Sequence, residues 1–339
     1  MTIKDVAVHS GVSVSTVSRV LNNHPDVSAP VREKVLKSIQ TLHYVPNNSA
    51  RDLVKPQSDS IGVIVRGAEN LFFTSVILAV ERAITEAGYT MVLHQIKAGE
   101  DELFAGASLT RSKRLRGLLF LGGCYDYSEE QVNSLEVPFV CCTFTNSFGS
   151  LDKSSFSSIS IDDEEEAYKA VSYLTDRGHR TIAVLLNSKE DRSVSELRFR
   201  GYARALRDAG TEPDPSLIAE ISGYQMDGAY EATKELVGRR PDMTAIFAIA
   251  DSLGIAAIKA LHDSGKRVPE DCSVTAIDGI ELSRYTIPTL TTLIQPREIM
   301  GRKAVQSLVD VLEGKGKNTH LYLETELRPG ESVADLRRT

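Results

Sequence analysis

The sequence lacks the features that mark several classes of protein. Its 339 residues contain no apolar run approaching the ~20 residues of a membrane-spanning helix. The N-terminus is polar and has none of the apolar core of a signal peptide, so we expect a cytoplasmic protein with no membrane partner. A hydrophobic content of 42% and a charged content of 25% instead match a globular chain, and the length predicts two or three domains.

Cysteine is also scarce, with four residues at positions 124, 141, 142 and 272. None of them forms a CxxC pair, and no histidine stands at zinc-ligand spacing from them, so we expect no metal site. Free thiols of this kind suit a reducing compartment.

The common catalytic motifs are missing as well. There is no G-x-x-x-x-G-K-[ST], no G-x-G-x-x-G after the first predicted strand, no H-E-x-x-H and no G-x-S-x-G. The acidic run at residues 162–166 resembles a metal cluster, but acids also favour the first turn of a helix, and we prefer that interpretation. The sequence therefore predicts neither an enzyme nor a bound cofactor.

Charge is divided unevenly along the chain. Residues 1–57 carry seven Lys or Arg and four acids, a net charge of +3, which leaves −10 for the remainder of a chain whose total is −7. A basic head on an acidic body favours a local contact with a polyanion.

Apolar residues of the first 46 positions recur at helical spacing in three segments, at Ile3, Val6 and Ala7, at Val17, Val20 and Leu21, and at Val31, Val35, Ile39 and Leu42. Thr2 and Asp5 predict a capping box, Ser13 and Ser28 can cap the next two helices, and Gly11 suits a turn with positive φ. This pattern matches a helix-turn-helix whose second helix enters the major groove of DNA. Periodicity alone leaves a three-helix protein-interaction module as the alternative.

Specific residues favour DNA binding. The motifs T-I-K-D-V-A from Thr2, G-V-S-x-x-T-V-S-R-V-L-N from Gly11, L-x-Y-x-P-N from Leu42 and A-R-x-L from Ala50 resemble the lactose/galactose-repressor (LacI/GalR) family of bacterial regulators. The resemblance implies a homodimer on a pseudo-palindromic double-stranded operator. It further implies base-edge contacts by Val14, Ser15 and Arg19, and phosphate contacts by Ser13, Thr16, Ser18, Asn22 and Tyr44. Arg19 is the strongest candidate, since its guanidinium can donate two hydrogen bonds to guanine.

Residues 47–57 are expected to form a hinge helix and linker after a head at residues 1–46. Asn47 can cap a short helix that Pro56 ends, and about two turns of helix are marginal alone in water. The resemblance implies that this helix folds on DNA and places Leu53 as a wedge in the minor groove, with Asn47 and Ala50 beside it. The alternative is a linker helix with Leu53 packed on the body.

The sequence pattern of residues 58–339, the body of the protein, predicts an α/β fold of two doubly wound, parallel-sheet lobes. Strand-like runs are expected at 61–65, 91–94, 117–121, 139–142, 159–161, 181–186, 245–249 and 273–277, with amphipathic helical stretches between them. The resemblance implies lobes like those of periplasmic sugar-binding proteins, with three crossings that we place near Ser160, Leu290 and Leu321. The predicted lobes are residues 58–160 plus 291–320, and 161–290 plus 321–339.

Ligands of open α/β sheets bind at the carboxyl ends of strands. The candidate effector-binding residues lie there or at helix entrances: Phe72, Phe73, Phe144, Arg198, Tyr224, Asp251 and Asp278. Phe72 and Phe73 could stack on a sugar ring or pack internally. Arg198 matches R-x-x-G-[FYW], which by resemblance implies a bidentate contact to ligand oxygens, with a surface salt bridge as the alternative. Asp251 and Asp278 could accept sugar hydroxyls or serve as cap or turn residues.

The sequence leaves the effector class open. Thr143, Ala250 and Gly279 stand where the family often has polar residues, so we expect fewer polar anchors in the pocket. The resemblance favours sugars or sugar phosphates as the effector over purines and nucleosides. We therefore expect a sequence-specific transcriptional repressor whose operator affinity is controlled by a small molecule, a sugar or sugar derivative. The alternative is an α/β enzyme or a solute-binding protein with an appended DNA-binding head.

Overall fold

The computed structural model describes residues 2–21, 24–42, 58–67, 69–97, 99–190 and 192–338. The chain divides into two compact units, Met1–Ser58 and Asp59–Thr339. Five residues predicted to contact DNA, and with them the hinge helix, lie outside the described residues: Asn22, Tyr44, Asn47, Ala50 and Leu53. Within the described ranges, no helix combines the length and the apolar character needed to cross a membrane.

The first unit contains the three predicted helices, α1 (Ile3–Ser10), α2 (Val14–Leu21) and α3 (Ala29–Thr41). The backbone N–H of Thr2 donates to Asp5 Oδ2 at 2.7 Å, and Gly11 ends α1 with φ 61°. Ser13 Oγ accepts from the backbone N–H of Thr16 at 3.2 Å at the start of α2. Val6, Val17, Val20 and Val35 are buried between the helices. The predicted helical pattern and the caps at Thr2 and Ser13 are therefore confirmed.

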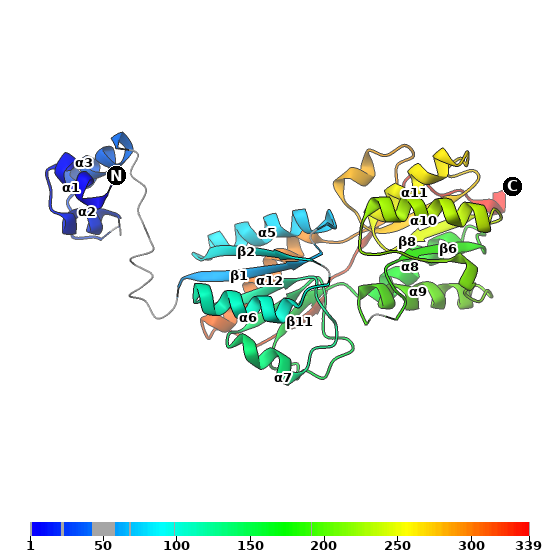
Figure 1. Ribbon diagram of the computed structural model, residues 1–339, viewed down its shortest axis with the longest axis horizontal. Coiled ribbons are helices and arrows are strands. Elements are labelled where there is room, and N and C mark those ends of the chain that lie inside the picture. The colour runs from blue at the N-terminus through cyan, green and yellow to red at the C-terminus, as the bar shows by residue number, and fades with distance from the viewer. Residues whose placement is uncertain are drawn as a thin grey trace. The chain divides into compact units, whose positions relative to one another are not determined.

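The second unit begins with a six-stranded parallel sheet in the order β11-β5-β4-β3-β1-β2. Its strands are β1 (Ser60–Arg66), β2 (Thr90–Ile96), β3 (Gly117–Leu121), β4 (Phe139–Cys142), β5 (Ser157–Ser160) and β11 (His320–Tyr322). Helices α5 (Phe72–Glu86) and α12 (Arg297–Leu312) pack together on one side, and α6 (Glu102–Lys113) contacts β1 and β3 (Figure 1). Every residue of β3 and β4 is buried, as expected for strands covered on both faces.

A further sheet has the order β12-β10-β9-β8-β6-β7, and only its β10–β12 pair is antiparallel. Its strands are β6 (Ile182–Leu186), β7 (Ile218–Glu220), β8 (Ala245–Ala248), β9 (Ser273–Asp278), β10 (Thr291–Ile294) and β12 (Glu326–Arg328). Helices α8 (Asp163–Thr175) and α9 (Val194–Asp208) cover one face, and α10 (Met226–Arg239) and α11 (Asp251–Asp263) cover the other (Figure 1). The predicted fold class is confirmed.

The chain crosses between the lobes three times, after β5, after β10 and after β11. Two crossings lie later than the sequence predicted. Thr291–Ile294 pairs with β9, so this segment belongs to the second lobe, and Leu321 and Tyr322 still belong to the first. A short buried strand looks the same in sequence whichever sheet it joins, which explains the error.

Gly201 brings α9 close to α8. A Cβ atom at this position would lie 2.1 Å from the carbonyl oxygen of Glu164 and 2.8 Å from the Cβ of Ala167. The absent side chain therefore permits the close approach of the two helices. It also fixes the distance between Arg198, one turn earlier on α9, and Asp163 at the start of α8.

Candidate functional site

A cavity of about 390 Å³ opens where the carboxyl ends of strands from the two lobes meet. Its first-lobe wall includes Arg66, Asn70, Phe72, Phe73, Cys124 and Tyr125, and its second-lobe wall includes Asn187, Arg192, Arg198, Tyr224, Asp278 and Gln295. The volume is in the range of small-molecule sites. Five of the seven predicted effector residues line this cavity: Phe72, Phe73, Arg198, Tyr224 and Asp278.

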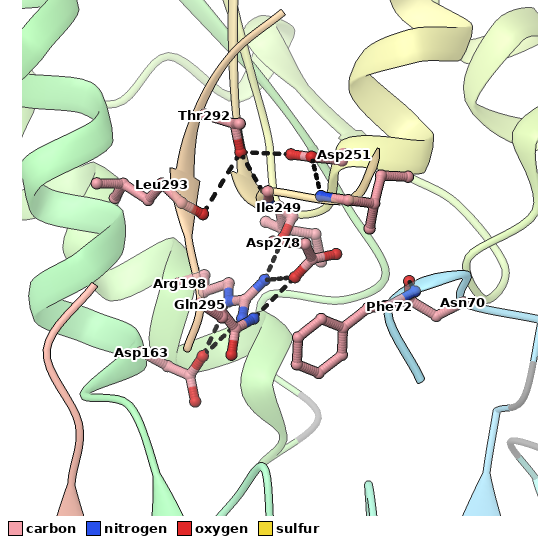
Figure 2. Close-up of polar contacts among 12 residues, drawn as sticks. Asn70, Phe72, Asp163, Arg198, Ile249, Asp251, Asp278, Thr292, Leu293 and Gln295 are labelled. Atoms are coloured by element: carbon pink, nitrogen blue, oxygen red, sulfur yellow. Dashed lines mark hydrogen bonds and ion pairs between the residues drawn. The ribbon is translucent and has the colours of Figure 1, made fainter. Parts of the chain in front are cut away.

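Phe144 and Asp251 do not line the cavity, and for these two the prediction is wrong. The ring of Phe144 is fully buried, with its centroid 5.4 Å from that of Tyr125 and 6.1 Å from that of Tyr127. Asp251 is also fully buried, and it accepts hydrogen bonds from the backbone N–H of Ile280 at 2.8 Å and from Thr292 Oγ1 at 2.5 Å (Figure 2). Asp251 follows a strand, as predicted, but its carboxylate stabilises the loop after β9 through the hydrogen bond from Ile280.

Arg198 is the centre of the second-lobe wall. Its Nε and Nη2 both donate to Asp163 Oδ1, at 2.9 and 2.8 Å, and its Nη1 donates to the carbonyl oxygen of Ile249 and lies 3.7 Å from Asp278 Oδ1 (Figure 2). The side chain is only 6% exposed, so the alternative of a surface salt bridge is wrong. Burial disfavours the charge, but Asp163 and Asp278 outweigh it and raise the pKa of Arg198 above its ordinary value.

Asp278 ends β9 in a strained conformation, with φ 137°, and Gly279 follows with φ 67°. Its Oδ1 accepts from Gln295 Nε2 at 2.8 Å (Figure 2). Its Oδ2 is buried without a hydrogen-bond partner among the described residues. Burial raises the pKa of Asp278 to about 7, although Arg198 acts to lower it, and the nearby Asp251 carboxylate raises it further. A buried acceptor without a donor, at a cavity wall, favours a ligand that supplies the donor.

The first-lobe wall rests on the buried carboxylate of Glu102. This carboxylate accepts from the backbone N–H of Cys124 at 2.6 Å and from Tyr127 Oη at 2.5 Å, and it lies 3.5 Å from Arg66 Nε. Burial, followed by the nearby Glu102, raises the pKa of Cys124 to about 11, which keeps the thiol protonated. Tyr125 Oη donates to Asp163 Oδ2 at 3.4 Å and so links the two lobes.

The lobes are also joined at the rim of the cavity. Arg192 Nη2 donates to the carbonyl oxygen of Phe148 at 2.8 Å, and its Nη1 lies 3.5 Å from Asp126 Oδ2. The guanidinium of Arg200 on α9 stands 4.8 Å from the centroid of the Phe148 ring. Contacts between lobes of this kind stabilise the arrangement that encloses the cavity.

The sequence did not identify several polar or aromatic residues of the cavity wall, among them Arg66, Asn70, Tyr125, Asn187, Arg192 and Gln295. They come from segments far apart in the chain. Arg66 is the last residue of β1, and Asn187 and Gln295 directly follow β6 and β10. This position at the carboxyl end of β1, β6 or β10 is the sequence signal that could have found these three residues.

On the head, α2 presents the predicted DNA-reading residues to solvent. Val14 is 41% exposed, and the side chain of Arg19 is 60% exposed. Arg19 Nη1 lies 3.1 Å from Asp26 Oδ2, whose other carboxylate oxygen is 2.8 Å from His24 Nδ1. Ser13 Oγ is 2.8 Å from the hydroxyl oxygens of both Ser15 and Thr16, and Ser18 is half-buried. Arg19 is therefore accessible to solvent, with its Nη1 atom paired to Asp26.

Each of the two units of the structure has a match among known protein families. Residues 2–47 match the sequence family described as bacterial regulatory proteins, lacI family, and residues 171–333 match a periplasmic binding protein-like domain. The chain is 41% identical over 339 residues to the HTH-type transcriptional regulator MalR of Clostridium butyricum, covering 99% of this chain and 100% of that protein. It is 33% identical to the HTH-type transcriptional regulator CelR of Thermobifida fusca, with 98% of each chain covered.

Solved structures agree with these sequence matches. A complex of the transcriptional regulator CelR with cellobiose has a TM-score of 0.70 at 30% identity, and the lac repressor dimer bound to operator and the anti-inducer ONPF has a TM-score of 0.77 at 26% identity. Each alignment covers 98% of this chain and 99% of the other. The chain therefore belongs to the lacI family of bacterial regulatory proteins, and it is a transcriptional regulator with a helix-turn-helix head and a periplasmic-binding-protein-like body.

Proposed function

We propose that this regulator represses transcription as a homodimer on a pseudo-palindromic operator, and that a sugar or sugar derivative in the cavity between its lobes controls its affinity for DNA. The observation that carries the proposal is the cavity wall formed by Arg198, Asp278 and Phe72, in the same chain as the exposed face of α2. Two solved relatives support it, one in complex with cellobiose and the other a dimer bound to operator and an anti-inducer.

The DNA-binding half of the proposal places α2 in the major groove. Val14, Ser15 and Arg19 then face base edges, while the hydroxyls of Ser13, Thr16 and Ser18, with Asn22 and Tyr44, contact phosphates. Leu53 of the predicted hinge, flanked by Asn47 and Ala50, supplies the wedge in the minor groove. Selection of bound duplexes from a random pool tests this half. It should return a palindromic sequence, and enrichment of no sequence would contradict it.

The effector half places the ligand between Phe72 and the polar cluster of Arg198 and Asp278. The ring of Phe72 offers an apolar face to a sugar, and Asp278 Oδ2 can accept a hydroxyl hydrogen (Figure 2). In this proposal the protein binds its effector without chemical turnover, and it acts in the cytoplasm, where the chromosome lies.

A thermal-shift screen tests the effector half directly. A compound that binds only the native state raises the unfolding midpoint. The proposal expects at least one sugar or sugar derivative to raise the midpoint and to change operator affinity, and to be recovered unaltered after prolonged incubation. A compound that is consumed during incubation would instead support an enzyme.

A further inference from the structure

We infer that the effector is an uncharged saccharide and that the cavity rejects sugar phosphates and other phosphorylated ligands. The inference rests on the proposed function, because it concerns the occupant of the same cavity. It follows from the pairing of the cavity's charged groups, from the caps on two helix N-termini and from two buried acceptors.

Each cation that lines the described part of the cavity wall already has an acidic partner. Arg66 Nε lies 3.5 Å from Glu102, Arg192 Nη1 lies 3.5 Å from Asp126, and Arg198 Nη2 lies 2.8 Å from Asp163. The one acid in this part of the wall, Asp278, adds a fourth carboxyl group, 3.7 Å from Arg198. The three cations are therefore neutralised by Glu102, Asp126 and Asp163, and no positive charge on the described part of the wall is left over to pair with a phosphate.

The strength of this neutralisation depends on burial. The side chains of Glu102 and Asp163 are each only 3% exposed, so solvent screens them weakly. A phosphate that drew Arg66 or Arg198 away would leave a buried carboxylate unpaired, which is strongly unfavourable. Arg192 and Asp126 are more exposed, at 57% and 36%, and this pair is the weakest of the three.

Helix N-termini are the other common phosphate sites, and two of them reach the cavity. At the start of α5, Asn70 Oδ1 accepts from the backbone N–H of Phe72 at 3.0 Å. At the start of α9, Ser193 Oγ accepts from the backbone N–H of Ser195 at 3.1 Å, and the Glu196 carboxylate adds negative charge to the first turn. These protein groups occupy positions where a phosphate oxygen would otherwise bind.

The polar atoms still available point to a ligand that both donates and accepts hydrogen bonds. Three buried atoms of cavity-wall residues have no hydrogen-bond partner among the described residues: the acceptors Asp278 Oδ2 and Asn187 Oδ1, and the donor Arg66 Nε, which lies 3.5 Å from Glu102. An ionised phosphate offers acceptor oxygens, which would face these acceptors unfavourably, whereas a hydroxyl both donates and accepts. A saccharide supplies several hydroxyls together with an apolar ring face for Phe72.

Calorimetric titration of the full-length protein with pairs of sugars that differ by one phosphate group tests the inference. The pairs are glucose and glucose 6-phosphate, trehalose and trehalose 6-phosphate, and sucrose and sucrose 6-phosphate. Cellobiose, maltose and lactose serve as further neutral probes. At least one neutral sugar should bind, and any phosphorylated counterpart should bind at least about 100-fold more weakly, because it would leave a buried charge unpaired. Tighter binding of a phosphorylated member, or binding of hypoxanthine alone, would overturn the inference but leave a small-molecule effector intact. If no compound changed the titration heat, the unfolding midpoint or operator affinity, the proposed function itself would fail.

The weakest charge pair offers a sharper test. The variant Asp126→Asn frees Arg192 and should improve the affinity for the phosphorylated member by about threefold relative to its neutral partner. Glu130→Gln, an exposed change on the short helix α7 (Glu129–Val132), is the matched control and should leave the ratio unchanged. An unchanged ratio in the Asp126→Asn variant would contradict the assignment of Arg192 as a neutralised cation.

Discussion

Arg198 and Asp163 form a buried ion pair in which two nitrogens of the guanidinium donate to the same carboxylate oxygen, at 2.9 and 2.8 Å. The pair joins α9 to the start of α8. The other oxygen of Asp163 accepts from Tyr125 of the first lobe at 3.4 Å. A ligand that displaces Arg198 at the cavity wall would therefore affect Asp163 in the second lobe and, through Asp163, Tyr125 in the first lobe.

The variant Arg198→Ala should lose effector binding and lower the free energy of unfolding by about 3–5 kcal/mol, since it leaves Asp163 buried and unpaired. Calorimetry and chemical denaturation measure the two effects. The double variant Arg198→Met with Asp163→Asn should recover much of the stability but none of the binding. Arg207→Ala, an exposed change on the same helix, is the control. Effector binding at wild-type affinity in the double variant would remove Arg198 from the site.

The variant Asp278→Asn should stabilise the protein more at pH 8 than at pH 5. Burial raises the pKa of Asp278 to about 7 in the native state, whereas an aspartate in the unfolded chain titrates near about 3.9. Between these values the native state binds more protons than the unfolded state, so this group lowers stability as the pH rises from about 4 to 7. The free energy of unfolding of the variant relative to wild type should rise by roughly 1–3 kcal/mol between pH 5 and pH 8. An equal difference at both pH values would contradict the raised pKa.

The variant Gly201→Ala should lower the free energy of unfolding by about 1–3 kcal/mol, because its new methyl group would collide with the backbone of α8. Gly238→Ala in α10 is the matched control, since a Cβ there has no neighbour within 4 Å. The control should be neutral or stabilising by about 0.5–1 kcal/mol, because alanine favours a helix over glycine. Urea denaturation of both variants tests the pair, and equal stability would refute the close packing of α8 and α9.

The variant Arg19→Ala should weaken binding to the selected operator by roughly 1–3 kcal/mol per half-site and abolish the preference for one base pair in each half-site. Arg19→Lys should not restore that preference, because an ammonium lacks the planar pair of donors. Fluorescence anisotropy with operator variants measures both effects. A uniform loss of affinity across all sequences would instead make Arg19 a phosphate contact.

Much of the fold could be predicted from the sequence because its local signals agree with its tertiary structure. The apolar runs at 117–121 and 139–142 coincide with β3 and β4, and the capping residues Thr2 and Ser13 stand at the starts of α1 and α2. Sheet membership was harder to predict, since Thr291–Ile294 is a buried strand that could join either sheet.

The cavity wall could be predicted only in part. The rule that ligands bind after strands selected Asp278 correctly, but it also selected Asp251, whose carboxylate turns inward to Ile280 and Thr292. Position after a strand does not fix the direction of a side chain. Gln295 directly follows β10, a strand that the sequence did not predict, and Tyr125 reaches the cavity through the packing of its loop, which no local pattern encodes.

The central claim is that occupation of the cavity and binding of operator are energetically coupled. The most direct test measures the affinity of the saccharide found by screening, by calorimetry, for the free protein and for the protein saturated with operator. The account predicts that the two affinities differ by about 5- to 150-fold, with the same factor appearing in operator affinity when the saccharide is added. Identical saccharide affinity with and without operator would contradict it.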